Sequence, residues 1–269
     1  MKCTLAALAV FALAASSARA AVLYDASLDV PSKTPAQAPW SWTSLGVPDG
    51  STVETGSVSG QVGYTTLTTT QGSGGTGATD GFFASKGSPF TDASFGSQAL
   101  NRIAGYTVNF NVAITAEAHA ADNQRSGFDI IVESSDHLGV EIGFWTNTVF
   151  AYNSDATFTP GESVAWNSTG MNAYALSVLG NNYVLSSGNT VLLQGALRSY
   201  SKPGSLPVSP FDIYQVPDFI FLGDDTTRAS ATANIAKVEV VALPEPATLG
   251  FAAIGAAGLL LRRRRAPGA

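Results

Sequence analysis

Three carboxylates and a tryptophan near the middle of the chain are spaced so that they could bind or hydrolyse a polysaccharide. Asp129 and Glu133 fall on one face of a predicted strand, because side chains alternate along a strand. Glu141 and Trp145 fall on one face of the next predicted strand. A glycoside hydrolase needs one carboxylic acid and a second carboxylate as base or nucleophile. The candidate catalytic residues are Glu141 with Asp129 or Glu133, and the candidate sugar-binding residues are Trp145, Glu141 and Asp129.

Apolar residues on the opposite face of these two strands predict their register, and the register sets the positions of the acids relative to one another. Residues 128–132 and 140–144 both alternate, and a loop at Ser134–Leu138 would pair their apolar faces without a register conflict. Glu141 then lies opposite Ile131 and diagonal to both acids of the first strand, about 7–8 Å away. Ile131 stands where a third polar group would assist hydrolysis. We therefore expect a sugar-binding or simply solvent-facing outer face, with glycoside hydrolysis as the alternative.

Two adjacent carboxylates, Asp224 and Asp225, form the candidate metal site. They follow a predicted buried strand, and loop carboxylates suit Ca²⁺, which takes about six to eight oxygen ligands. The alternative is a turn in which Asp225 caps the local backbone. His119 and His137 have no spacing typical of metal ligands, and no motif for an organic cofactor is found. A structural calcium ion is thus the one cofactor that the sequence suggests.

Turn residues separate many short apolar segments, and no segment between residues 21 and 243 shows sustained helical periodicity. The pattern predicts a single all-β domain, a β-sandwich of jelly-roll or concanavalin-like type. The expected strands are 105–117, 128–132, 140–144, 148–152, 173–179, 183–185, 190–194, 219–222 and 233–241.

The charge of this domain excludes one class of partner. Residues 21–243 contain 8 basic and 19 acidic residues, a net charge of −11. An acidic surface without a basic run repels nucleic acid, so nucleic-acid binding is not expected.

The first residues read as a secretory signal peptide. Lys2 precedes an apolar run at 5–15, and Ala18-Arg19-Ala20 is a small-x-small cleavage site. We expect residues 1–20 to be removed after Ala20. Cys3 leaves with them, so disulfides cannot stabilise the mature protein.

The last residues read as a membrane-held segment. Pro244-Glu245-Pro246 is followed by the uncharged stretch 247–261, about 22 Å of helix, and then by Arg262-Arg263-Arg264-Arg265. Four arginines hold their end of a helix in the cytoplasm, so the domain before Pro244 would be exported. The predicted organisation is therefore a signal peptide (1–20), a β-sandwich (21–243), a sorting segment (244–265) and a tail (266–269).

The order of Pro-Glu-Pro, short apolar helix and arginine cluster resembles the PEP-CTERM protein-sorting signal of Gram-negative bacteria. The resemblance implies recognition by an exosortase at or near Pro244-Glu245-Pro246, in a bacterium that makes extracellular polysaccharide. It also implies transient residence in the inner membrane, followed by delivery to the outer envelope, cell surface or matrix.

The exported domain resembles the choice-of-anchor Y surface domain. The resemblance rests on the segments Asn123–Phe128, Gly139–Trp145, Leu197–Tyr200 and Pro217–Thr226, and it implies no established activity. The function expected from the sequence is that of a non-enzymatic structural or polysaccharide-binding protein of the envelope or matrix. An envelope glycoside hydrolase is the alternative.

Overall fold

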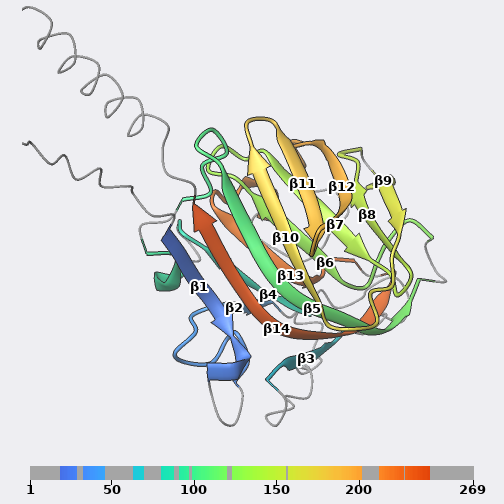
Figure 1. Cartoon of the computed structure of the whole chain (residues 1–269), viewed down its shortest axis with the longest axis horizontal. Coiled ribbons are helices and arrows are strands. Elements are labelled where there is room, and N and C mark those ends of the chain that lie inside the picture. The colour runs from blue at the N-terminus through green and yellow to red at the C-terminus, as the bar shows by residue number, and fades with distance from the viewer. Residues whose placement is uncertain are drawn as a thin grey trace, which may run out of the picture. The chain divides into compact units, whose positions relative to one another are not determined.

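The exported domain is built from two antiparallel sheets (Figure 1). The computed structural model describes residues 19–28, 33–45, 63–69, 80–87, 91–96, 99–119, 123–155, 157–201, 212–226 and 228–242. Sheet I has the spatial order β1 (Arg19–Asp25), β14 (Ser230–Ala242), β5 (Tyr106–Ala118), β10 (Asn172–Leu179), β11 (Asn182–Ser187) and β12 (Thr190–Ala196), and β3 (Thr65–Thr68) also pairs with β14. Sheet II has the order β2 (Thr43–Leu45), β4 (Asp80–Ser85), β13 (Phe219–Asp224), β6 (Asp129–Glu133), β7 (Gly139–Phe144), β8 (Thr148–Tyr152) and β9 (Pro160–Ala165). The predicted all-β sandwich is confirmed.

Helical structure is limited to short 3-10 turns in the described part of the chain. These are η1 (Ala26–Leu28), η3 (Ala93–Phe95) and η4 (Ile213–Gln215). Within the described ranges, no helix has both the length and the apolar character needed to span a membrane.

The described residues belong to one compact unit, Arg19–Leu243. Arg19 and Ala20 begin β1, where they pair with Ala242 and Val241 of β14. The rest of the predicted signal peptide, the sorting segment 244–265 and the tail lie outside the described residues. The domain boundaries therefore stay predictions.

The long strands β5 and β14 are neighbours inside sheet I, and they pair along almost their whole length. In β5 the apolar positions Tyr106, Val108 and Phe110 are at most 1% exposed, whereas Thr107 and Asn109 between them are half-buried on the outer face. This is the alternation that the sequence predicted for residues 105–117. Each fully buried apolar side chain contributes about 1.5–3 kcal/mol relative to an exposed one.

Aromatic rings join the two sheets across the main core. Phe110 of β5 lies 5.1 Å from the ring of Tyr174 on β10 and 6.2 Å from the ring of Phe144 on β7. Phe144 and Tyr174 also meet edge to face, with ring centroids 5.3 Å apart. The three rings therefore fix sheet II against sheet I near the centre of the sandwich.

The predicted register of the β6–β7 hairpin is confirmed. Val132 pairs with Val140, Ile130 with Ile142, and Ile131 with Glu141. The loop closes through a hydrogen bond from the amide of Ser134 to the carbonyl of Leu138, 3.0 Å long. One face of the hairpin enters the main core, and the acids lie on the other face of sheet II, as the alternation predicted.

The outer face of sheet II, however, does not face solvent, which corrects the expectation of an open face. Phe158, Tyr200 and Tyr214 lie over it, with ring centroids 5.4–5.7 Å apart. Together with strand residues they form a second apolar cluster: Phe83, Ile131, Phe150, Tyr152, Phe158, Tyr200, Tyr214, Val216, Phe219 and Phe221. Alternation within a strand could not show this cover, because Phe158 comes from the loop between β8 and β9, and Tyr200 and Tyr214 come from segments far away in the sequence.

Gly127 lets the chain enter β6 beside the start of β14. A Cβ atom on Gly127 would lie 2.0 Å from the carbonyl carbon of Ser230 and 2.5 Å from the amide nitrogen of Ala231. A Cβ atom on Gly170 would meet nothing within 4 Å. The close approach of another backbone therefore explains the glycine at position 127, whereas no such approach is found at position 170.

We predict that Gly127→Ala lowers the free energy of unfolding by about 3 kcal/mol, because the new methyl group must push two backbones apart. Gly170→Ala should change it by less than about 0.5 kcal/mol. Urea denaturation of the exported protein measures both values. Equal midpoints for the two variants would show that the backbones do not approach as described.

Candidate functional site

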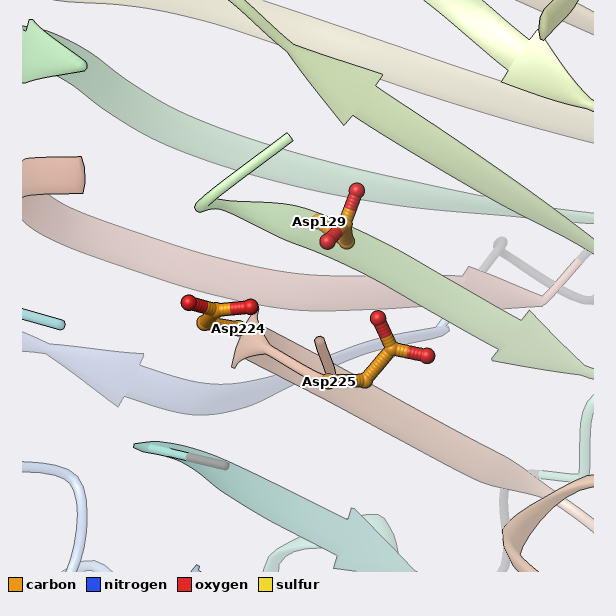
Figure 2. Close-up of side chains that lie close together, drawn as sticks. All are labelled: Asp129, Asp224 and Asp225. Carbon is orange, nitrogen blue, oxygen red and sulfur yellow. The ribbon is translucent and has the colours of Figure 1, made fainter. Parts of the chain in front are cut away.

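Four acidic side chains gather at one end of the second cluster. Asp129 projects from β6 and Glu141 from β7, and their diagonal placement is the one that the hairpin register predicted. Asp224 ends β13 and Asp225 follows it (Figure 2). The four side chains are at most 4% exposed. We call Asp129, Glu141, Asp224 and Asp225 the acidic cluster.

Arg125, in the segment before β6, is the cation that contacts this cluster in the described part of the chain. Its Nη2 atom lies 2.5 Å from Asp225 Oδ1 and 3.5 Å from Glu141 Oε1. Its guanidinium group also lies 4.6 Å from the centre of the Tyr152 ring and 5.1 Å from that of Phe158. Burial by itself lowers the pKa of Arg125, but the negative charge of Asp225 and its neighbours raises that pKa well above its usual value.

Buried hydroxyl groups hold several of the carboxylate oxygens. The Tyr214 hydroxyl lies 2.7 Å from Glu141 Oε2 and 3.1 Å from Asp225 Oδ2. The Ser126 hydroxyl donates to Asp129 Oδ1. These contacts come from η4 and from the segment before β6, so the cluster is tied to the cover as well as to the sheet.

Three oxygens of the cluster lack a hydrogen-bond partner among the described residues: Asp129 Oδ2, Asp224 Oδ2 and Glu141 Oε1. The last of these lies 3.5 Å from Arg125 Nη2. Asp224 Oδ1, by contrast, accepts a 2.8 Å hydrogen bond from the amide of Thr226. One ligand oxygen from each of Asp129, Asp224 and Asp225 lies within 4.8 Å of the others. The structure thus joins the predicted metal pair Asp224 and Asp225 to an acid that the sequence assigned to the sugar face.

Burial dominates the electrostatics of these acids. It raises the pKa of Asp129 and of Asp224 well above the usual aspartate range, and Asp225 adds to both shifts. Burial and the nearby charge of Asp225 raise the pKa of Glu141 to about 8. Each negative charge is therefore costly here unless a cation or a donor compensates for it.

Glu133 lies apart from the cluster although it shares a strand face with Asp129. It is 0% exposed, and neither carboxylate oxygen has a hydrogen-bond partner in the described ranges. Burial, followed by the charge of Glu141, raises its pKa well above the usual value. Asp129, Glu133 and Glu141 are thus all closed off from a polysaccharide at the surface.

Trp145, the predicted sugar platform, is half-buried, and another side chain covers one face of its indole ring. His119 stacks on the indole ring at a centroid distance of 4.2 Å and an interplanar angle of 13°. The edge of the ring meets Phe150 at 4.8 Å, and Nε1 donates to the carbonyl of Arg125. The tryptophan therefore fixes the Arg125 segment in place, and its role as a sugar platform stays a prediction.

Sequence reasoning missed Arg125, Tyr152 and Tyr214 as members of this site. Arg125 is separated from Asp225 by 100 residues in sequence, so no local pattern joins them. The sequence held one signal, the scarcity of cations. Residues 21–243 contain 8 basic and 19 acidic residues, so several buried acids would have to share one basic residue.

Comparison with known proteins identifies the sorting signal. The PEP-CTERM protein-sorting motif matches residues 242–265, so the match begins at the last residue of β14 and includes the predicted segment 244–265. Comparison with curated proteins gives no match. The resemblance of the domain to choice-of-anchor Y stays a prediction.

Solved structures of low similarity share parts of the sandwich. Alginate lyase A1-II', a member of polysaccharide lyase family-7, is 14% identical, with a TM-score of 0.44 over 76% of this chain and 95% of that chain. A conserved carbohydrate esterase from Shiga toxin-encoding bacteriophage phi24B is 11% identical, with a TM-score of 0.39 over 76% of this chain and 100% of that chain. A native glycosidic hydrolase is 14% identical, with a TM-score of 0.38 over 82% of this chain and 94% of that chain. At these low values no activity is transferred to this chain.

The chain therefore carries the PEP-CTERM protein-sorting motif at residues 242–265, which supports an exosortase substrate of a Gram-negative bacterium.

Proposed function

We propose that the exported domain is a non-enzymatic component of the envelope or extracellular matrix. The observation that supports this most is the complete burial of Asp129, Glu133 and Glu141 beneath the aromatic cover. An acid or base must come within hydrogen-bonding reach of the substrate to transfer a proton. Glu141 instead contacts Arg125 and Tyr214, and Asp129 accepts a hydrogen bond from Ser126, so both are engaged within the interior.

We propose further that exosortase acts at or near Pro244-Glu245-Pro246 while the stretch 247–261 is held in the inner membrane. The stretch has fifteen residues, whereas a stable span needs about 20, so it suits a brief stay before processing. The domain then reaches the outer envelope, cell surface or matrix.

The polysaccharide partner that we propose for the domain contacts the outer face of sheet I. On that face the amides of Asn109 and Asn111 lie opposite the small side chains of Ala175 and Ala173 on β10. Amide and hydroxyl groups both donate and accept, as sugar hydroxyls require. The alanines leave space on the β10 side of the amides, whereas on the β14 side Asn109 donates to Glu239 and Asn111 pairs with Lys237. The space on the β10 side favours sheet I over the covered face of sheet II.

The first prediction of this proposal is binding without hydrolysis. The exported protein, incubated with a panel of bacterial polysaccharides, should retain at least one of them and release no reducing ends. Asn111→Ala should weaken that retention by about threefold or more, because an amide that bonds the sugar is lost. Asn147→Ala, which removes an exposed amide at the β7–β8 turn, is the matched control and should leave retention unchanged.

Reducing ends that appear with the natural protein and vanish with Glu141→Gln would establish a glycoside hydrolase instead. Retention that Asn147→Ala weakens as much as Asn111→Ala would remove sheet I from the account. A blank panel in both assays would leave a purely structural domain and contradict the polysaccharide partner.

The second prediction concerns sorting. Replacing Pro244, Glu245 and Pro246 by alanine should keep the full-length chain in the inner membrane, because the exosortase loses its recognition sequence. Pro267→Ala changes a proline outside the matched motif and should not alter delivery. Immunoblots of cell fractions from an exosortase-producing Gram-negative host measure both, and unchanged size and fractionation of the triple variant would contradict exosortase processing.

A further inference from the structure

The acidic cluster carries more negative charge than the described residues around it neutralise. Arg125 contacts Asp225 and approaches Glu141, whereas Asp129 and Asp224 make no ion pair with any residue that the structure describes. Two uncompensated carboxylates in a buried site are strongly unfavourable. A bound cation or protons must therefore balance them.

Of the three cluster oxygens without a hydrogen-bond partner among the described residues, Glu141 Oε1 still lies 3.5 Å from Arg125 Nη2. The other two, both on aspartates, show where the balance is needed. Asp129 Oδ2 and Asp224 Oδ2 belong to side chains that are 0% exposed, so water at the surface does not reach them. Leaving a buried acceptor unpaired costs about 1–3 kcal/mol, and more when it is charged. These atoms come from neighbouring strands, since Asp129 pairs with Gly223, the residue just before Asp224.

The geometry of the three aspartates fits a single ion. A Ca²⁺ ion binds oxygens at about 2.3–2.6 Å, so two of its ligands lie at most about 5 Å apart. One oxygen from each of Asp129, Asp224 and Asp225 meets this limit, since all three lie within 4.8 Å of one another. Figure 2 shows the three carboxylates side by side, one from β6 and two from the end of β13.

Gly223 explains how two consecutive aspartates can reach the same place. Its φ is +153°, and a Cβ atom there would lie 2.2 Å from the carbonyl oxygen of Asp80. The strand can therefore leave its regular alternation at this position, and it ends at Asp224. Asp225 is then free to turn toward β6 instead of projecting to the opposite face.

We propose that Asp129, Asp224 and Asp225 bind one Ca²⁺ ion, which ties β6 to the end of β13. The donor set contains oxygen only, which favours a hard cation over zinc. Mg²⁺ demands shorter bonds of about 2.0–2.1 Å in near-ideal octahedral geometry, so its ligands must lie closer together. The site adds a structural ion to the exported domain and is independent of the polysaccharide and exosortase proposals.

Calorimetric titration of the exported protein, stripped with EDTA and dialysed, tests this site with CaCl₂ and separately with MgCl₂. We expect one Ca²⁺ per chain and at least tenfold weaker binding of Mg²⁺. When free Ca²⁺ exceeds its Kd about a hundredfold, the Tm should rise by about 5–10 °C.

Asp129→Asn and Asp224→Asn keep the side-chain volume and remove one charge each. Both should weaken Ca²⁺ binding at least tenfold, yet match or exceed the Tm of the natural protein in EDTA, because they relieve repulsion. Glu133→Gln is the matched control. It neutralises another fully buried acid on the same strand face, which also lacks a hydrogen-bond partner in the described part of the chain. It should leave the Kd within about twofold.

Absence of Ca²⁺ binding and of any Tm shift would overturn the proposal and leave protons as the balancing charge. Equal or tighter binding of Mg²⁺ would overturn the choice of ion. Loss of binding in Glu133→Gln to the same degree as in Asp224→Asn would overturn the assignment of the three ligands.

Discussion

One buried guanidinium organises the outer face of sheet II. Arg125 joins Asp225, which follows β13, to the hairpin acid Glu141, and it lies against the rings of Tyr152 and Phe158. Each carboxylate of the cluster is buried, so its stability depends on this charge and on the surrounding hydroxyl groups. Arg125 thus neutralises part of the negative charge beneath the aromatic cover, and the proposed Ca²⁺ ion balances the charge of Asp129 and Asp224.

This arrangement separates the two faces of the sandwich by role. Strands β4, β13, β6 and β7 of sheet II are buried on both sides, by the main core and by the second cluster. Sheet I keeps a polar outer face. The sorting motif begins at the last residue of β14, so the sandwich leads directly into the sorting segment.

The alternation of apolar and polar residues predicted much of the fold. It predicted β5, and it predicted the β6–β7 register down to the diagonal placement of Glu141, because one apolar face suffices to fix a hairpin. It did not reveal β4, whose six residues are all buried and therefore do not alternate. It also missed β9, which opens with Pro160 and Gly161. The cover and the Arg125–Asp225 pair depend on contacts between distant segments, which no local pattern encodes.

Chemical denaturation of Arg125→Met tests most directly whether the cluster is sealed and partnered. Methionine keeps much of the side-chain volume and removes the charge, so the free energy of unfolding should fall by at least about 3 kcal/mol. Lys237→Met breaks the surface pair with Glu239 and should cost less than about 1 kcal/mol. If Arg125→Met proves no more destabilising than Lys237→Met, the acids of sheet II are not held by a buried cation, and the account is contradicted.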